Sequence, residues 1–270
     1  MRISTVSANF NFKSNDRHLH KNSKGEVLIR ESGSYCPAEF DKLVYSNYTN
    51  FFRPDLNSGH VSKYYTDGTW NGFCQTIGEH FKDAPKVNVY DFACSDGSEA
   101  YSLILSLLDK FGEEEAKKYF PILAYDIDDE MIKVAKSGEI PVCDDDIRRF
   151  HYNIQNLNQT DFYKITFQQD SPSSKAFVAN EKLRNKVHFQ QEDILNALDS
   201  IESSNSLILC RNFFPYLSKV QMWEIIGKLR FKLDSTSLVV IGNFDKFTTS
   251  APFASCGFEE VCPLVYRKRC

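Results

Sequence analysis

The chain has 270 residues, of which 42% are hydrophobic and 25% are charged, and its formal net charge is −4. These values are typical of a globular protein with a sizeable core, and the slight negative charge gives no electrostatic case for binding nucleic acid. No window is long and apolar enough for a transmembrane helix, and the first residues lack the apolar core of a signal peptide. The sequence therefore predicts a cytoplasmic protein without membrane insertion.

The cysteine pattern argues against a metal or redox site. Eight cysteines are present, and no two of them have C-x-x-C spacing. Several lie in apolar stretches, where a free thiol behaves as a small hydrophobic group. His18 and His20 are a candidate metal pair, but the nearby sequence offers no further ligand. We therefore predict no metal site.

The N-terminal part is predicted to precede the main domain. Residues 1–33 form a polar leader, partly disordered, with a strand over 25–30 that belongs to a hairpin. Residues 34–85 are predicted to form a short helical cap, with one helix over 37–45. A second helix has an apolar face made of Trp70, Phe73, Ile77 and Phe81.

The segment 87–111 is the one around which the rest of the chain is organised. It combines an apolar strand over 87–93, a turn of small residues and a helix. The apolar face of that helix consists of Ala100, Leu103, Ile104, Leu107, Leu108 and Phe111. In an open α/β sheet such a turn lies at the strand ends, where ligands bind.

The turn itself excludes some ligands. It has one glycine, Gly97, where a dinucleotide fingerprint has three, and no Walker A lysine follows, so a pyrophosphate ligand is not expected. Its small residues, including Ala93 and Ser95, allow the backbone to approach a ligand closely. Glu99, in the first helical turn, suits a ligand with a positive group. This stretch alone favours a simpler interpretation, in which Glu99 complements the helix dipole, an effect worth roughly 0.3–1 kcal/mol.

A second strand and helix follow. The strand covers 121–126, and Asp128 is the candidate N-cap of a helix that runs to Lys136. Asp126 ends the strand, where Rossmann-like folds bind ribose hydroxyls, and its two oxygens suit a vicinal diol. Alternatively, the Asp126 carboxylate only caps the loop. Asp128 is the other candidate both for binding the ribose and for capping the loop.

Residues 138–185 interrupt the alternation of strands and helices and are predicted to form a small inserted β-subdomain. Strands over 162–167 and 175–179 are expected to pair antiparallel. The acidic run 144–146 is interpreted as a solvated helix start.

The alternation then resumes. Strands are predicted over 187–191, 206–210 and 237–242, and the segments 258–261 and 264–267 are predicted to form a closing antiparallel pair. A helix over 218–233 is expected to turn inward the residues Val220, Trp223, Ile226 and Leu229.

This pattern predicts an α/β protein with a largely parallel sheet. Successive strands are followed by polar groups that converge on one edge, namely Glu99, Asp126, Asp193 and Asn212. A ligand with an amine, a ribose diol and an adenine amino group would use all of them. S-adenosylmethionine has these three groups.

Four motifs make the chain resemble the CheR-type chemotaxis-receptor methyltransferases. Residues 93–102 (ACSDGSEAYS) are similar to A-x-S-x-G-E-E-P-Y-S, and 126–128 (DID) to D-I-D. Residues 210–217 (CRNFFPYL) are similar to C-R-N-x-x-x-Y-F, and 49–53 (TNFFR) to T-x-F-F-R. The resemblance covers residues 37–268.

The resemblance implies a Rossmann-like class I methyltransferase sheet over 86–270, preceded by the short cap. Glu99 would hold the amino group of S-adenosylmethionine, Asp126 the ribose and Asp193 the adenine, with Asn212 beside the cofactor. Arg53 and Tyr216 would lie near the transferred methyl group as catalytic residues. The inserted subdomain would match a family feature that docks the tail of a receptor.

The sequence also departs from the family. Ser98 and Ala100 replace a glutamate and a proline of the loop, and Asp193 stands where asparagine is common. Only about fifty residues, 37–86, match the family's helical N-terminal domain, and they contain no basic helix. The protein substrate, for which a chemoreceptor is one candidate, is therefore open.

The resemblance implies methyl transfer to a glutamate side chain of a protein, with S-adenosylhomocysteine as product. We also predict a monomer. Arg53 suits a carboxylate because a guanidinium donates two parallel hydrogen bonds. Alternatively, Arg53 forms a structural ion pair. Tyr216 could likewise only pack in the wall of the pocket. Two other functions stay open: methylation of a small molecule or a nitrogen atom, and non-catalytic binding of the cofactor by an adaptor.

Overall fold

The computed structural model describes residues 17–21, 27–31, 70–142, 144–157, 162–167, 175–242 and 245–270. In this part of the chain, seven strands form the main sheet in the order β11-β12-β10-β9-β3-β4-β8. They are β3 (Asn88–Phe92), β4 (Ile122–Asp126), β8 (Val187–Gln191), β9 (Ser206–Cys210), β10 (Leu238–Ile241), β11 (Phe258–Cys262) and β12 (Val265–Lys268). Neighbours pair in parallel except at β12, which is antiparallel to both β10 and β11. The predicted α/β class, with its closing antiparallel pair, is confirmed.

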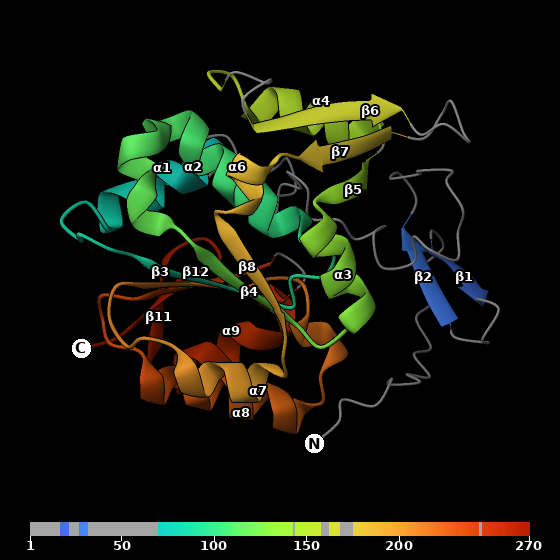
Figure 1. Ribbon diagram of the computed structural model, residues 1–270. Coiled ribbons are helices and arrows are strands. Elements are labelled where there is room, and N and C mark those ends of the chain that lie inside the picture. Colours follow the sequence, from blue (N-terminus) through green and yellow to red (C-terminus); the bar gives the residue numbers. More distant parts are fainter. Residues whose placement is uncertain are drawn as a thin grey trace.

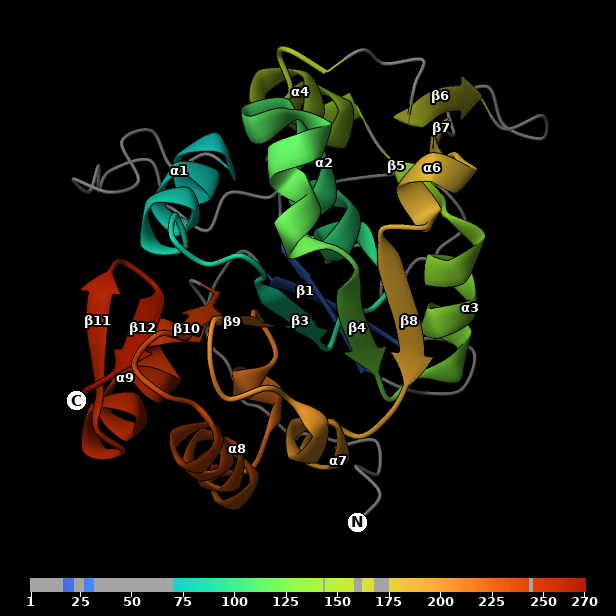
Figure 2. The ribbon, with the colours of Figure 1, turned by 60° about the vertical axis from the view of Figure 1, so that its left-hand side comes forward.

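Helices cover both faces of the main sheet (Figures 1 and 2). One face carries α1 (Trp70–His80), α2 (Ser98–Ala116) and α3 (Asp129–Ser137), and the other carries α7 (Ile194–Ala197), α8 (Lys219–Lys232) and α9 (Lys246–Ser255). Short turns of helix connect these elements: η2 (Lys117–Tyr119), α6 (Glu181–Arg184), η3 (Leu198–Ser200) and η4 (Phe214–Tyr216). The apolar face predicted for α1 is confirmed, because all four of its residues are buried.

The central strands are buried on both sides, which explains their continuous apolar sequence. Along β9, Leu207 and Leu209 pack under α1 and α2, while Ile208 and Cys210 pack under α8. This two-layer core fixes the strand ends, from which the polar side chains of the site project.

The face predicted for α8 was wrong at two residues. Val220 is 75% exposed and Trp223 is 44% exposed. The buried face consists of Met222, Ile225, Ile226 and Leu229. These four have the i, i+3, i+4, i+7 spacing of a full apolar stripe, whereas the predicted set took i, i+3 steps alone and drifted off the core side.

The insertion forms a separate small sheet beside α2 (Figure 1). Within the described residues its order is β5-β7-β6, with β5 (Glu139–Val142), β6 (Tyr163–Phe167) and β7 (Lys175–Ala179), and α4 (Asp144–Asn153) follows β5. The antiparallel pairing of β6 with β7 is confirmed. The strand β5 was not predicted. Asp146 is buried, so the prediction of a solvated acidic run was wrong at this residue, which α4 turns toward the protein.

Asp109 on α2 fastens the insertion to the main domain. One oxygen, Oδ1, accepts the backbone N–H groups of Gln155, Asn156 and Leu157 at 3.0, 2.6 and 2.7 Å. Such charge-assisted bonds from three successive amides hold the end of α4 against α2.

In the N-terminal part, β1 (Arg17–Lys21) pairs antiparallel with β2 (Val27–Glu31), as the predicted hairpin required. The helix predicted over 37–45 lies outside the described residues, and the domain boundaries at 33 and 85 remain predictions. Of the helices that the structure describes, none has the length and hydropathy needed to cross a bilayer.

Candidate functional site

The polar groups predicted to converge do lie along one edge of the main sheet. β8, β4, β3 and β9 are consecutive neighbours, and all four run in the same direction. Asp193 follows β8, Asp126 ends β4, the turn 93–98 follows β3 and Asn212 follows β9. The cofactor roles of these residues remain proposals.

The turn after β3 has an unusual backbone. Ala93, Ser95 and Gly97 have φ angles of 59°, 50° and 80°. The left-handed region costs a residue with a side chain roughly 1–2 kcal/mol, and such residues cluster at functional sites. Gly97 is also required by packing, because a Cβ there would lie 2.7 Å from the Phe189 ring. The turn therefore takes a shape that sequence propensity alone does not favour.

Asp126 holds this turn. Its Oδ2 accepts the Ser95 N–H at 2.8 Å and its Oδ1 accepts the Asp128 N–H at 2.9 Å. Burial raises the pKa of Asp126, and these two N–H groups oppose that shift. Asp128 instead caps α3 by accepting the Glu130 N–H at 2.9 Å. The predicted N-cap is thus confirmed, and Asp126 is the acid placed at the site edge.

Glu99 forms a buried ion pair. Its Oε2 lies 2.7 Å from Nη1 of Arg211, and the two side chains are 3% and 4% exposed. The Arg211 guanidinium also lies over the Trp70 ring, 4.9 Å from its centroid, a cation–π contact. Glu99 therefore already has a cation from its own chain, which the sequence did not indicate.

Two further acids, missed from the sequence, are buried in β3 and in the turn after it, and the first of them, Asp91, lies near this pair. Among the described residues, Oδ2 of Asp91 and Oδ2 of Asp96 have no hydrogen-bond partner. Burial raises the pKa of Asp91, with Glu99 adding to the shift and Arg211 opposing it. Burial likewise raises the pKa of Asp96 from 3.8 to about 6. Asp91 was a detectable signal, since it is an acid inside an apolar strand.

We expect Asp96→Asn to stabilise the protein at neutral pH. Because the pKa of Asp96 is raised, its proton is held more tightly in the folded state, so wild-type stability falls as pH rises from 3.8 through about 6. At about 1.4 kcal/mol for each pKa unit, the loss reaches about 3 kcal/mol. The amide keeps an oxygen for the Ser98 N–H, which donates to Asp96 Oδ1 at 3.0 Å.

Urea unfolding at about pH 4 and about pH 7.5 measures this effect. The variant should gain over wild type at the higher pH alone, whereas the exposed Asp83→Asn should gain at neither. An equal difference at both pH values would contradict the assignment of the titration to Asp96.

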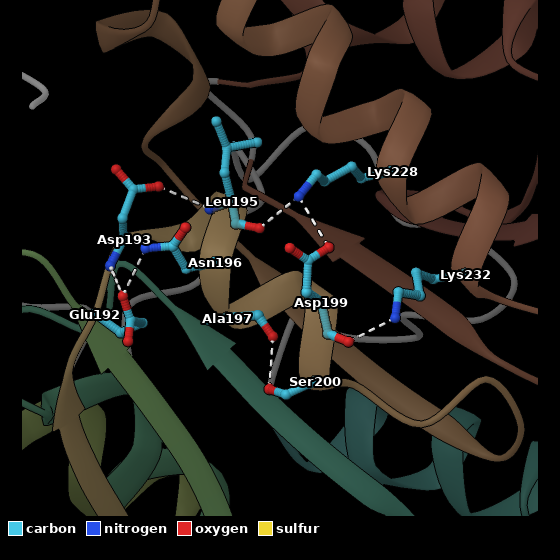
Figure 3. Close-up of polar contacts among 9 residues, drawn as sticks. All are labelled: Glu192, Asp193, Leu195, Asn196, Ala197, Asp199, Ser200, Lys228 and Lys232. Atoms are coloured by element: carbon cyan, nitrogen blue, oxygen red, sulfur yellow. Dashed lines mark hydrogen bonds and ion pairs between the residues drawn. The ribbon is translucent and has the colours of Figure 1, made fainter. Parts of the chain in front are cut away.

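Asp193 caps α7, accepting the Leu195 N–H at 2.8 Å (Figure 3). Glu192 supports it from the other side, because its carboxylate accepts the Asp193 N–H at 3.0 Å. α8 holds α7 in place through Lys228, whose Nζ donates to Leu195 O at 2.8 Å and to Asp199 at 2.9 Å.

Asn212 and Tyr216 lie in the segment that leaves β9. Asn212 has a φ of 62°, and its N–H donates to Asp245. Tyr216 ends η4, and 57% of the residue is exposed. Arg53, the other predicted catalytic residue, lies outside the described residues.

These polar groups fit a cofactor that carries both a positive charge and a nucleoside. The buried carboxyl groups of Asp91 and Glu99 share the single guanidinium of Arg211, which favours a ligand that brings positive charge. The carboxylate oxygens of Asp126 and Asp193, which can accept hydrogen bonds, lie at the ends of the strands β4 and β8. In the described part of the chain, no group of three or more His, Cys, Asp or Glu side chains could hold a metal ion.

The strand order, with an antiparallel strand between β10 and β11, and the acids at the carboxyl edge define a Rossmann-like fold of the S-adenosylmethionine-dependent methyltransferase class. The family model described as CheR methyltransferase, SAM binding domain, matches residues 47–261. The chain therefore belongs to this family, whose cofactor is S-adenosylmethionine.

The relatives are distant. The chain is 25% identical over 160 residues to a chemotaxis protein methyltransferase of Escherichia coli, a match that covers 59% of this chain and 52% of that protein. It is 22% identical over 243 residues to one of Borreliella burgdorferi, covering 89% and 77%. The matched region thus spans about half the length of the Escherichia coli protein. A solved methyltransferase of Archaeoglobus fulgidus is similar over 70% of this chain and 68% of its own, with 15% identity and a TM-score of 0.38.

Proposed function

We propose that this protein transfers the methyl group of S-adenosylmethionine to a glutamate carboxylate of another protein, and that a chemoreceptor is the leading candidate substrate. The observation that carries the proposal is the placement of the family's motif residues on one sheet edge: the turn 93–99, Asp126 and Asn212 come from consecutive strands. The names of the relatives support the acceptor class.

In this proposal Asp126 binds the ribose hydroxyls, Asp193 accepts from the adenine amino group and Asn212 lies beside the cofactor. Glu99, with Asp91 near it, faces the ammonium group. The cofactor supplies an electrophilic methyl on a sulfonium. The chain excludes water, places the acceptor oxygen in line, and needs no proton transfer, because a glutamate with a pKa near 4.3 is already ionised at pH 7.

The described residues favour an acceptor that needs no general base. His80 Nε2 lies 2.9 Å from Thr236 O, just before β10 begins, and so at the opposite edge of the sheet. Cys94 and Cys210 lie at the site edge, but burial raises the pKa of each thiol well above 9.0. An amine acceptor, largely protonated at pH 7, would require such a base.

The methyl ester is the expected product, and its lability tests the proposal. The enzyme is incubated with a cell extract and methyl-labelled cofactor. The proteins that it labels should release most of the label as methanol in mild alkali. N-methyl and thioether products would keep it. The Asp126→Ala variant, which loses a cofactor ligand in this proposal, is the control and should transfer little label.

Two outcomes would contradict this function in different ways. Alkali-stable label would exclude a carboxylate acceptor and leave methyl transfer to nitrogen or to a small molecule. Binding of S-adenosylhomocysteine without any transfer would favour the adaptor.

A further inference from the structure

Asp245 lies fully buried where β10 gives way to α9. Its Oδ2 accepts the N–H groups of Asn212 at 2.5 Å and Gly242 at 2.7 Å, and its Oδ1 accepts the Phe214 N–H at 3.0 Å. Gly242 follows β10 and Asn212 follows β9, so one carboxylate joins the carboxyl ends of two neighbouring strands.

This use of the side chain is not the usual one for its position. Asp245 is the N-cap residue of α9, yet its side chain makes no capping bond to that helix. An aspartate at an N-cap ordinarily accepts N–H groups of its own first turn. Here its backbone oxygen accepts from Thr248 and Thr249, and the carboxylate is directed across to the segment after β9.

The contacts fix a strained and crowded segment. Asn212 has a left-handed φ of 62°. A Cβ added to Gly242 would lie 2.0 Å from Asn212 Oδ1 and 2.7 Å from its backbone nitrogen, so the Asn212 side chain lies directly against the Gly242 backbone. Phe214, the third partner, begins η4, which ends at Tyr216.

We infer that Asp245 is a positioning residue for methyl transfer: its carboxylate holds Asn212 in its left-handed conformation beside the cofactor and sets the start of the helix that presents Tyr216. This inference rests on the proposed function, which gives Asn212 and Tyr216 their roles. Asp245 itself acts through these residues and not on the substrate.

Asp245→Asn tests the inference because it keeps the size of the side chain and removes one of two acceptor oxygens. Three N–H groups then share a single oxygen, and the new amide N–H faces one of them. We expect the dissociation constant for S-adenosylhomocysteine, measured by calorimetry on folded protein, to rise about tenfold or more, the scale for a lost buried partner. Asp245→Glu, which keeps both oxygens, should bind more tightly than the asparagine variant.

Asp109→Asn is the matched control. Asp109 is also a buried acid whose carboxylate accepts three backbone N–H groups, but these belong to the insertion, at Gln155, Asn156 and Leu157. We expect it to lower the unfolding temperature comparably while changing the dissociation constant less than about twofold. Equal affinities for the two asparagine variants would overturn the inference, because Asp245 would then be a structural acid only.

Different results would contradict the proposed function and the inference about Asp245. Wild-type protein that gives no heat with S-adenosylhomocysteine would remove the proposed function. Wild-type binding with an unaffected Asp245→Asn variant would remove the inference alone. Transfer kinetics add a second readout: loss of Tyr216 placement should lower kcat calculated per folded enzyme, whereas reduced folding alone leaves the kcat of the folded fraction unchanged.

Wild-type protein answers the same question if Asp245→Asn does not fold. In amide-resolved NMR spectra, the N–H signals of Asn212, Gly242 and Phe214 should shift when S-adenosylhomocysteine saturates the site. The Gln155 and Asn156 signals should stay in place. Unchanged signals at all three Asp245 partners would overturn the inference.

Discussion

Arg211→Met is expected to destabilise the folded protein by about 3–5 kcal/mol, the loss that follows when one partner of a buried ion pair is removed. The substitution leaves the Glu99 carboxylate buried without its cation and removes the contact with the Trp70 ring. It also removes the charge that opposes the upward pKa shift of Asp91. Urea unfolding of the two proteins measures the difference.

The double variant Arg211→Met/Glu99→Gln separates the lost pair from the lost packing. Because no uncompensated charge remains, it should recover most of the stability, so the two substitutions should be strongly non-additive. Additive effects would show that the ion pair does not control stability. Lys133→Met, which removes a salt bridge of exposed side chains with Asp129, is the control and should cost at most about 1 kcal/mol.

Arg53→Ala is expected to lower turnover by roughly 10²–10³-fold while leaving the affinity for S-adenosylhomocysteine nearly unchanged. The reason is the role that the motif around Arg53 implies, which is to orient the acceptor carboxylate through two parallel N–H groups. Arg53→Lys should restore only part of the rate, because an ammonium lacks the fork geometry. Single-turnover kinetics with labelled cofactor, beside calorimetry, provide both quantities.

The alternative for Arg53 is a structural ion pair, and it predicts a different result. In that case Arg53→Ala would lower the folded fraction, while the specific activity of the remaining folded enzyme would match wild type.

The main sheet could be predicted because its strands carry their own signal. β9 is an apolar run buried on both faces, and β4 ends at Asp126, two residues before the N-cap Asp128. The order of these elements also predicted which polar groups share an edge, since parallel strands bring their carboxyl ends together.

Features that depend on contacts between distant segments could not be predicted. Asp245 gives no signal in sequence, because its three partners include Asn212 and Phe214, more than thirty residues away. Arg211 stood next to a predicted site residue, but its pairing with Glu99 needs β9 to lie beside β3. The buried face of α8 was predicted wrongly for a related reason. The helix has two apolar stripes, and its packing against the sheet determines which of them is buried.

The position of β12 has a consequence for synthesis on the ribosome. β12 follows β11 in sequence but lies between β10 and β11 in the sheet. A nascent chain that has released β10 therefore presents a fully apolar strand with one unpaired edge until residues 265–268 emerge. Unpaired apolar edges invite pairing with other chains. Released chains truncated between α9 and β12 should thus bind chaperones more strongly than the chain that includes β12.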